Sequence, residues 1–246
     1  MNKSGRIELL DYARGMALLA MTVFHFAFDL ELLGIKEPGF ISQPHWKYFA
    51  RAIASFFLFL AGFGLYLAHG NGMRWSSWRW RMFKIIAAAL LITIATLYAT
   101  PDQFIFFGIL HSIGFASLAG LVFLPLPAII IAATAIGVFA IGQTFETAIL
   151  DHWIWWWTGL SETSIISSDY VPVFPWFSAP LLGIACAKFF TQSEWLDALR
   201  IPRFSSAPTR LVKLIGRHSL VYYLLHQPVM IMLIYSYLYM TGQIVS

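Results

Sequence analysis

Long stretches without charge are the feature that most constrains this chain. No Asp, Glu, Lys or Arg occurs between Lys84 and Asp102, or between Asp102 and Glu146. A helix crosses roughly 30 Å of hydrocarbon with about 20 apolar residues, because each residue rises about 1.5 Å. Only 11% of the 246 residues are charged, against roughly 25% in soluble domains. A water-soluble monomer is excluded, and the sequence predicts an all-α, polytopic membrane helix bundle.

Charges and prolines divide the sequence into candidate membrane spans. We predict seven, over residues 15–33, 49–68, 85–99, 104–124, 128–145, 171–187 and 220–240. Pro172, Pro175 and Pro180 predict that the sixth helix is broken, because proline removes a backbone donor. Residues 1–246 are expected to form a single transmembrane domain.

The basic residues are distributed unequally between the two sides of these spans. Of the 16 Lys and Arg residues, all but Lys36, Lys47 and Arg51 fall on the side of the N-terminus. The positive-inside rule therefore places the N-terminus in the cytoplasm. Helix orientation accounts for these charges, so no nucleic acid partner is expected. The single cysteine, Cys186, excludes a Cys-ligated metal site, and no metal is expected.

Three histidines, His25, His111 and His226, fall within roughly 5 Å of the membrane midplane, at about 1.5 Å per residue. Ionisable groups are costly at that depth and are functional candidates. His25 and Asp29 lie four residues apart on one helix face. This spacing suits a carboxylate that orients a general base. Alternatively, Asp29 lies at the outer interface, and His111 and His226 are neutral histidines hydrogen-bonded between helices.

Several basic side chains are candidates for binding phosphate groups. Arg14 precedes His25 by eleven residues, which is three helical turns plus about 20°, so the two residues share one helix face. Three more basic residues are interleaved with tryptophans after the second span, and a last one stands at the base of the seventh span. These residues are Arg14, Arg79, Arg81, Lys84 and Arg217. The alternative is that they only orient the helices or extend to the interface.

Several segments together resemble the heparan-α-glucosaminide N-acetyltransferase catalytic-domain family of membrane proteins. The first contains Arg6 and Arg14 and continues to His25 and Asp29. The others include Phe-Gly-Ile-Leu before His111 and Tyr-Tyr-Leu-Leu before His226. The matching segments are 6–17, 59–64, 107–114, 174–178, 215–220 and 223–228.

The resemblance implies that residues 1–246 form a single transmembrane acyltransferase-like domain. Its donor would be a cytoplasmic acyl-CoA, with acetyl-CoA as the first expectation. Its acceptor would be a glycan, or a small molecule with an amine or hydroxyl, on the other side of the membrane. His25 inherits the catalytic role. We expect an integral protein of the bacterial cytoplasmic (inner) membrane that contacts lipid, and a homodimer is compatible with the sequence.

Two other functions fit the mid-membrane residues. A proton-coupled transporter would use His25 and Asp29 as a relay. A b-type haem protein would use two of the histidines as axial ligands. Visible absorption of the purified protein separates the haem protein from the others.

Overall fold

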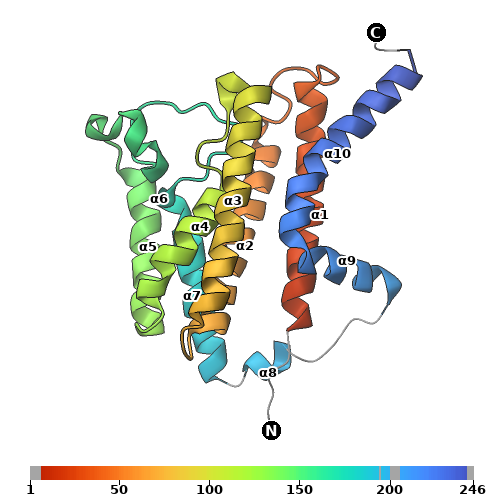
Figure 1. Ribbon diagram of the computed structural model, residues 1–246. Coiled ribbons are helices and arrows are strands. Elements are labelled where there is room, and N and C mark those ends of the chain that lie inside the picture. Colours follow the sequence, from red (N-terminus) through yellow and green to blue (C-terminus); the bar gives the residue numbers. More distant parts are fainter. Residues whose placement is uncertain (1–6, 194, 200–205, 243–246) are drawn as a thin grey trace. The chain divides into compact units, whose positions relative to one another are not determined.

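The computed structural model describes residues 7–193, 195–199 and 206–242, and every regular element in these ranges is a helix (Figure 1). The chain divides into two compact units. One comprises residues 1–53 and 200–246, and the other residues 54–199. The expectation of a single domain stays a prediction.

Helix α2 begins in the first unit and continues in the second. The first unit also contains α1 (Glu8–Leu32), α9 (Ala207–Arg217) and α10 (Ser219–Met240), with α2 covering Pro44–His69. The other helices of the second unit are α3 (Trp75–Ala99), α4 (Ile109–Ala119), α5 (Ala128–Thr144), α6 (Val173–Trp176), α7 (Ser178–Gln192) and α8 (Trp195–Leu199).

The predicted polytopic all-α architecture is confirmed. In the described part of the chain, 5 helices are long and apolar enough to cross a membrane: α1, α2, α3, α10 and the helix over Val173–Gln192. Two shorter apolar helices, Ile109–Phe123 and Ala128–Thr144, occupy the fourth and fifth predicted spans. Their lengths give about 22 and 26 Å at about 1.5 Å per residue.

Two predicted boundaries were wrong for local reasons. Helix α3 begins at Trp75, so residues 75–84, predicted as a loop, are helical. Helix α4 begins at Ile109 and not at 104, because the preceding backbone pairs with another segment. The carbonyl of Phe107 accepts from the Val171 amide at 3.0 Å.

The predicted orientation in the membrane stays a prediction. Four of the basic residues on which it rests lie outside the described residues: Lys3, Arg6, Arg200 and Arg203.

The sixth span is broken, as its prolines predict. Phe174 has non-helical backbone angles between Pro172 and Pro175, and α7 continues from Ser178.

Glycines let α2 and α7 approach closely in the second unit. A Cβ atom on Gly62 would collide with the Pro180 carbonyl, and one on Gly183 with the Phe59 carbonyl. Small residues at such crossings allow the backbones of membrane helices to meet.

This contact gives a stability prediction. Gly62→Ala should lower the free energy of unfolding by about 1–3 kcal/mol, because the added methyl overpacks the crossing. Gly137→Ala in α5 is the matched control, since a Cβ there meets nothing within 4 Å. That change should be neutral or stabilise by up to about 1 kcal/mol. Thermal unfolding in one detergent compares them, and equal effects of the two substitutions would contradict this account of the crossing.

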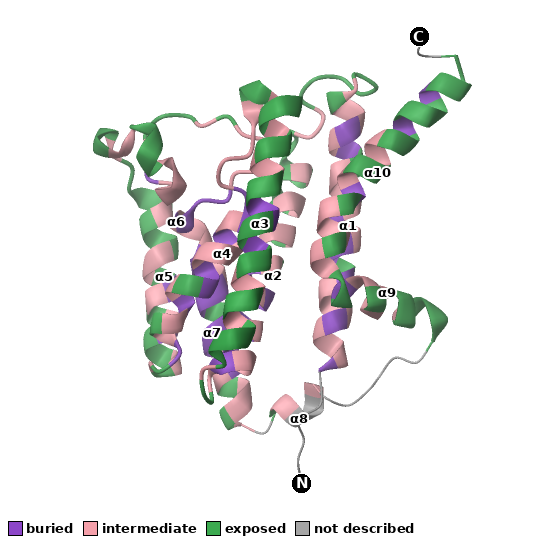
Figure 2. Cartoon of the chain, in the orientation of Figure 1, coloured by how far each residue is buried: buried purple, intermediate pink, exposed green. Residues whose placement is uncertain are grey.

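In the first unit, α1 packs against both α9 and α10. A Cβ on Gly15 would meet the Val212 carbonyl, and one on Gly216 the Asp11 carbonyl, so α9 crosses α1 at short range (Figure 1). Most of α10 is half-buried or exposed (Figure 2). His226 is one of its buried residues. The contact between α1 and α10 therefore brings together side chains of the first and last spans.

Candidate active site

Polar side chains join α1 to α10 at two levels. The hydroxyls of Thr22 and Tyr222 lie 2.8 Å apart. About two turns further along α1, the Gln227 amide donates to Oδ1 of Asp29 at 3.1 Å. Because the residue numbers increase together on both helices, α1 and α10 run in parallel here.

His25 and His226 meet between these two levels. Their ring centroids lie 4.9 Å apart in an edge-to-face arrangement, and His226 is buried. The structure therefore brings together two of the three histidines predicted at the membrane midplane.

The hydrogen bonding of His226 defines its tautomer. Its Nδ1 lies 2.7 Å from the Tyr223 carbonyl oxygen, which can only accept, so Nδ1 carries a proton. In the neutral ring, Nε2 then carries a lone pair. This atom is buried and has no partner among the described residues.

Asp29 does not take the partner that the sequence suggested. Its side chain is fully buried, at 0% exposure, and bonds to Gln227. The described part of the chain shows no hydrogen bond from Asp29 to His25. Three acceptor-capable atoms of the site are buried without a described partner: Asp29 Oδ2, His25 Nδ1 and His226 Nε2. Buried polar atoms normally have partners, so this site is suited to a polar ligand.

Two arginines share one carboxylate in the first unit, toward the N-terminal end of α1. Asp11 is buried, at 1% exposure. Its oxygens lie 3.6 Å from Nη1 of Arg14 and 3.5 Å from Nε of Arg217 on α9. One turn earlier, Lys213 pairs with Glu8. Two of the predicted phosphate-binding residues therefore come together.

His111 lies in the second unit, where both its ring nitrogens are used. Nδ1 accepts from the Gly108 amide at 3.2 Å. Nε2 lies 3.2 Å from the Thr93 hydroxyl, whose proton goes to the Ile105 carbonyl at 2.7 Å, so Nε2 donates. This geometry favours the alternative of a neutral histidine hydrogen-bonded within the bundle. Its catalytic assignment stays a prediction.

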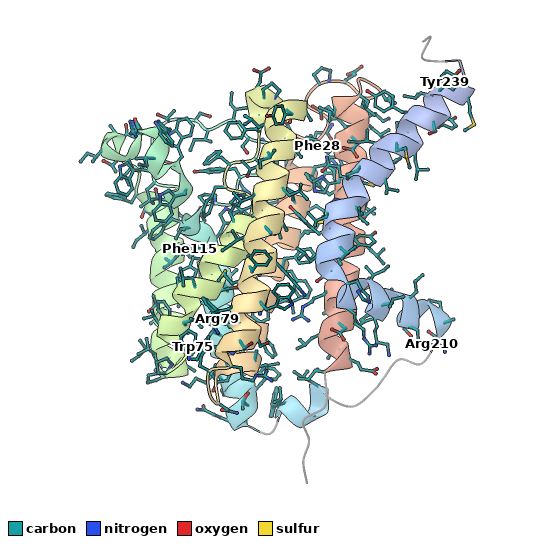
Figure 3. All side chains as sticks on the ribbon, in the orientation of Figure 1. Phe28, Trp75, Arg79, Phe115, Arg210 and Tyr239 are labelled. Carbon is teal, nitrogen blue, oxygen red and sulfur yellow. The ribbon has the colours of Figure 1, made fainter. Side chains whose placement is uncertain are left out.

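The remaining basic candidates, Arg79, Arg81 and Lys84, all lie on helix α3. Trp75 and Arg79 lie in its first turns (Figure 3). Lys84 lies over the Trp80 ring, with Nζ 4.9 Å from the centroid. Residues two apart on a helix do not face each other, so Arg79 and Arg81 point to different sides. Arg81 and Lys84, three residues apart, are neighbours on one face of the helix. The donor-binding role of Arg79, Arg81 and Lys84 stays a prediction.

The segment between α5 and α6 has its own polar anchors. Asp151 accepts from the Ser161 hydroxyl at 2.7 Å and from two backbone amides. These hydrogen bonds, led by that of Ser161, hold the pKa of Asp151 below its ordinary value. Burial raises the pKa of Tyr170 to about 12, and its hydroxyl donates to the Trp156 carbonyl.

Sequence reasoning missed the residues that connect the two helices of the site. The predicted site residues did not include Gln227, Thr22, Tyr222 or Tyr223. The spacing of polar residues in the last span was an available signal. It could not identify the neighbouring helix, because pairing of distant spans is not encoded in local periodicity.

The fold and the site define an integral membrane protein in which a buried histidine, His226, contacts the half-buried His25 between apolar helices. The family model for the catalytic domain of heparan-alpha-glucosaminide N-acetyltransferase matches residues 6–228. The chain belongs to this family of membrane acetyltransferases, which confirms the resemblance. Comparisons with curated proteins and with solved structures found no match.

Proposed function

We propose that this protein transfers an acetyl group from acetyl-CoA to an amine or hydroxyl acceptor on the other side of the membrane. Family membership supports the acetyl transfer. The observation that carries the proposal is the contact of His25 and His226 between α1 and α10, in which each ring has a buried nitrogen without a described partner. An acyl transfer needs such a nitrogen to take the proton of the attacking group.

The donor is proposed to enter from the cytoplasmic side. Arg14 and Arg217 converge on Asp11, and arginine forks suit phosphate groups. Arg14 and His25 belong to one continuous helix, and eleven residues at about 1.5 Å put them roughly 16 Å apart along its axis. An extended pantetheine arm has a length of that order. Phosphates near Arg14 would thus leave the thioester beside His25, in the part of the membrane that excludes water.

The chemistry needs only one base and a good leaving group. The acceptor attacks the acetyl carbon as its proton passes to a histidine, and the C–S bond breaks with its electron pair on sulfur. A thiol has a pKa near 8.5, so coenzyme A leaves readily as a thiolate. A proposed bacterial inner membrane location fits a cytoplasmic supply of acetyl-CoA.

The haem alternative is disfavoured for this pair of histidines. Two axial histidines hold a metal ion between them, each nitrogen about 2 Å from it. The rings of His25 and His226 instead touch edge to face at 4.9 Å, which leaves no space for a porphyrin between them. The transporter alternative has no family support, because the family shown is one of acetyltransferases.

Consumption of acetyl-CoA tests this function directly. Purified protein in detergent is incubated with acetyl-CoA and glucosamine, chosen from the family's name, and with a panel of other amines and hydroxylated glycans. Release of the coenzyme A thiol, with a product heavier by one acetyl group in mass spectrometry, is expected. A protein that binds no coenzyme A and consumes no acetyl-CoA with any acceptor would overturn the proposal.

A further inference from the structure

We propose that His226 on α10, and not His25 on α1, is the general base that takes the acceptor's proton. This inference rests on the proposed acetyl transfer and assigns a role within that site. The sequence alone favoured His25, because Asp29 stands one turn away on the same helix. The contacts within the first unit assign the two histidines differently.

A general base needs an accepting nitrogen toward the substrate and a fixed hydrogen bond at its other nitrogen. In hydrolase triads, a third group holds the N–H of the imidazole and so defines the tautomer. His226 has this arrangement. The Tyr223 carbonyl holds its Nδ1–H at 2.7 Å, and Nε2 is buried without a described partner.

His25 lacks the matching support. Its Nδ1 is the nitrogen that is buried without a described partner, and the carboxylate expected to orient it bonds to Gln227. Its ring packs edge to face on His226. His25 is therefore placed to contact the substrate, on the helix that carries Arg14, but no described hydrogen bond fixes its Nδ1.

Two cross-helix contacts hold His226 in position. The Thr22–Tyr222 pair lies one turn before it on α10, and Gln227, its immediate neighbour, bonds to Asp29. A backbone carbonyl and two flanking contacts give the preorganisation that catalytic geometry requires. The titratable side chains that the structure places around His226 are His25 and Asp29 on α1 and Tyr222 and Tyr223 on α10.

The proposed step balances as follows. The acceptor nitrogen or oxygen forms a bond to the acetyl carbon, while its N–H or O–H bond breaks and the proton passes to Nε2 of His226. The C–S bond breaks with its electron pair on sulfur. The resulting thiolate then takes the proton from Nε2, which gives coenzyme A, the acetylated acceptor and a neutral His226.

The pH dependence of kcat/KM distinguishes the two histidines. Loss of a proton from a general base produces a rate that rises with pH. His226→Asn removes Nε2, but its side-chain amide stands near the former Nδ1 and can still donate to Tyr223. We expect kcat/KM to fall about 10²-fold and the KM for acetyl-CoA to stay within about threefold. The increase of kcat/KM with pH, the rising limb of the profile, should disappear in this variant. It should persist in His25→Gln.

Matched variants keep the test independent of folding. Leu225→Ala changes a side chain that adjoins His226 on α10 but is 55% exposed and outside the site, and this variant should retain the pH dependence and most of the rate. If His226→Asn does not fold, His226→Gln takes its place. A rising limb that persists in the folded His226 variant and disappears in His25→Gln would overturn the assignment. A wild-type protein that consumes no acetyl-CoA would instead overturn the proposed function itself.

Discussion

Replacing His25 with alanine is expected to lower kcat by about 10²- to 10³-fold, the range for groups that stabilise the charge that develops at a reacting carbonyl. His25 contacts His226 and lies on the helix proposed to guide the donor. The truncation removes a ring that faces the reacting atoms, but it leaves the arginines near Asp11 untouched. Coenzyme A binding should therefore remain within about threefold of wild type.

Turnover of acetyl-CoA and calorimetric binding of coenzyme A, measured on the same preparation, check this expectation. Phe26→Ala is the control, because Phe26 adjoins His25 on α1 and is 48% exposed. It should change the rate by less than about threefold. Near-normal acetyl transfer by the His25→Ala protein would remove His25 from the reaction.

Arg14→Ala is expected to weaken coenzyme A binding by about 10- to 100-fold. A hydrogen bond to a charged group contributes about 1.5–3 kcal/mol, and 1.4 kcal/mol corresponds to a tenfold change in affinity. Arg14 is bound to the same carboxylate as Arg217, so its guanidinium is held beside a second phosphate-binding candidate. The effect on kcat with saturating donor should be small.

Lys213→Ala is the matched control for charge. Lys213 pairs with Glu8 at the contact of the same two helices, so its loss removes one positive charge from the same end of the unit. Its effect on coenzyme A binding should be at most about threefold. If calorimetry shows that Arg14→Ala binds coenzyme A as tightly as wild type, then Arg14 only anchors the helix at the membrane interface.

The sequence predicted the architecture well because apolar length is a local property. Uncharged stretches and prolines identified every apolar helix and the break before Ser178. The prediction failed at the start of α3. The tryptophans and arginines of residues 75–84 indicated a loop by their composition, but these residues extend the helix toward the interface. It also failed at 104–108, where pairing with Val171 replaces helical hydrogen bonds.

The candidate site was predictable only in part. Mid-membrane depth identified His25 and His226, because depth can be counted along each helix. The hydrogen-bond partner of Asp29 could not be predicted from positions along one helix. Gln227 lies 198 positions later in the chain, and packing of α1 against α10 decides that contact. The same reason applies to Asp11, whose pairing with Arg217 depends on the close approach of α9 at Gly216.

Transfer across a sealed membrane tests the central claim most directly. Proteoliposomes containing the protein are loaded with glucosamine, or with whichever acceptor the detergent assay identifies, and receive radiolabelled acetyl-CoA only outside. Protein molecules with their N-terminus outside should produce labelled, acetylated acceptor in the lumen while coenzyme A accumulates outside. Vesicles with His25→Ala should produce it at least about 10²-fold more slowly. Labelled product confined to the side of the donor, or no labelled product from the wild-type protein, would contradict the account.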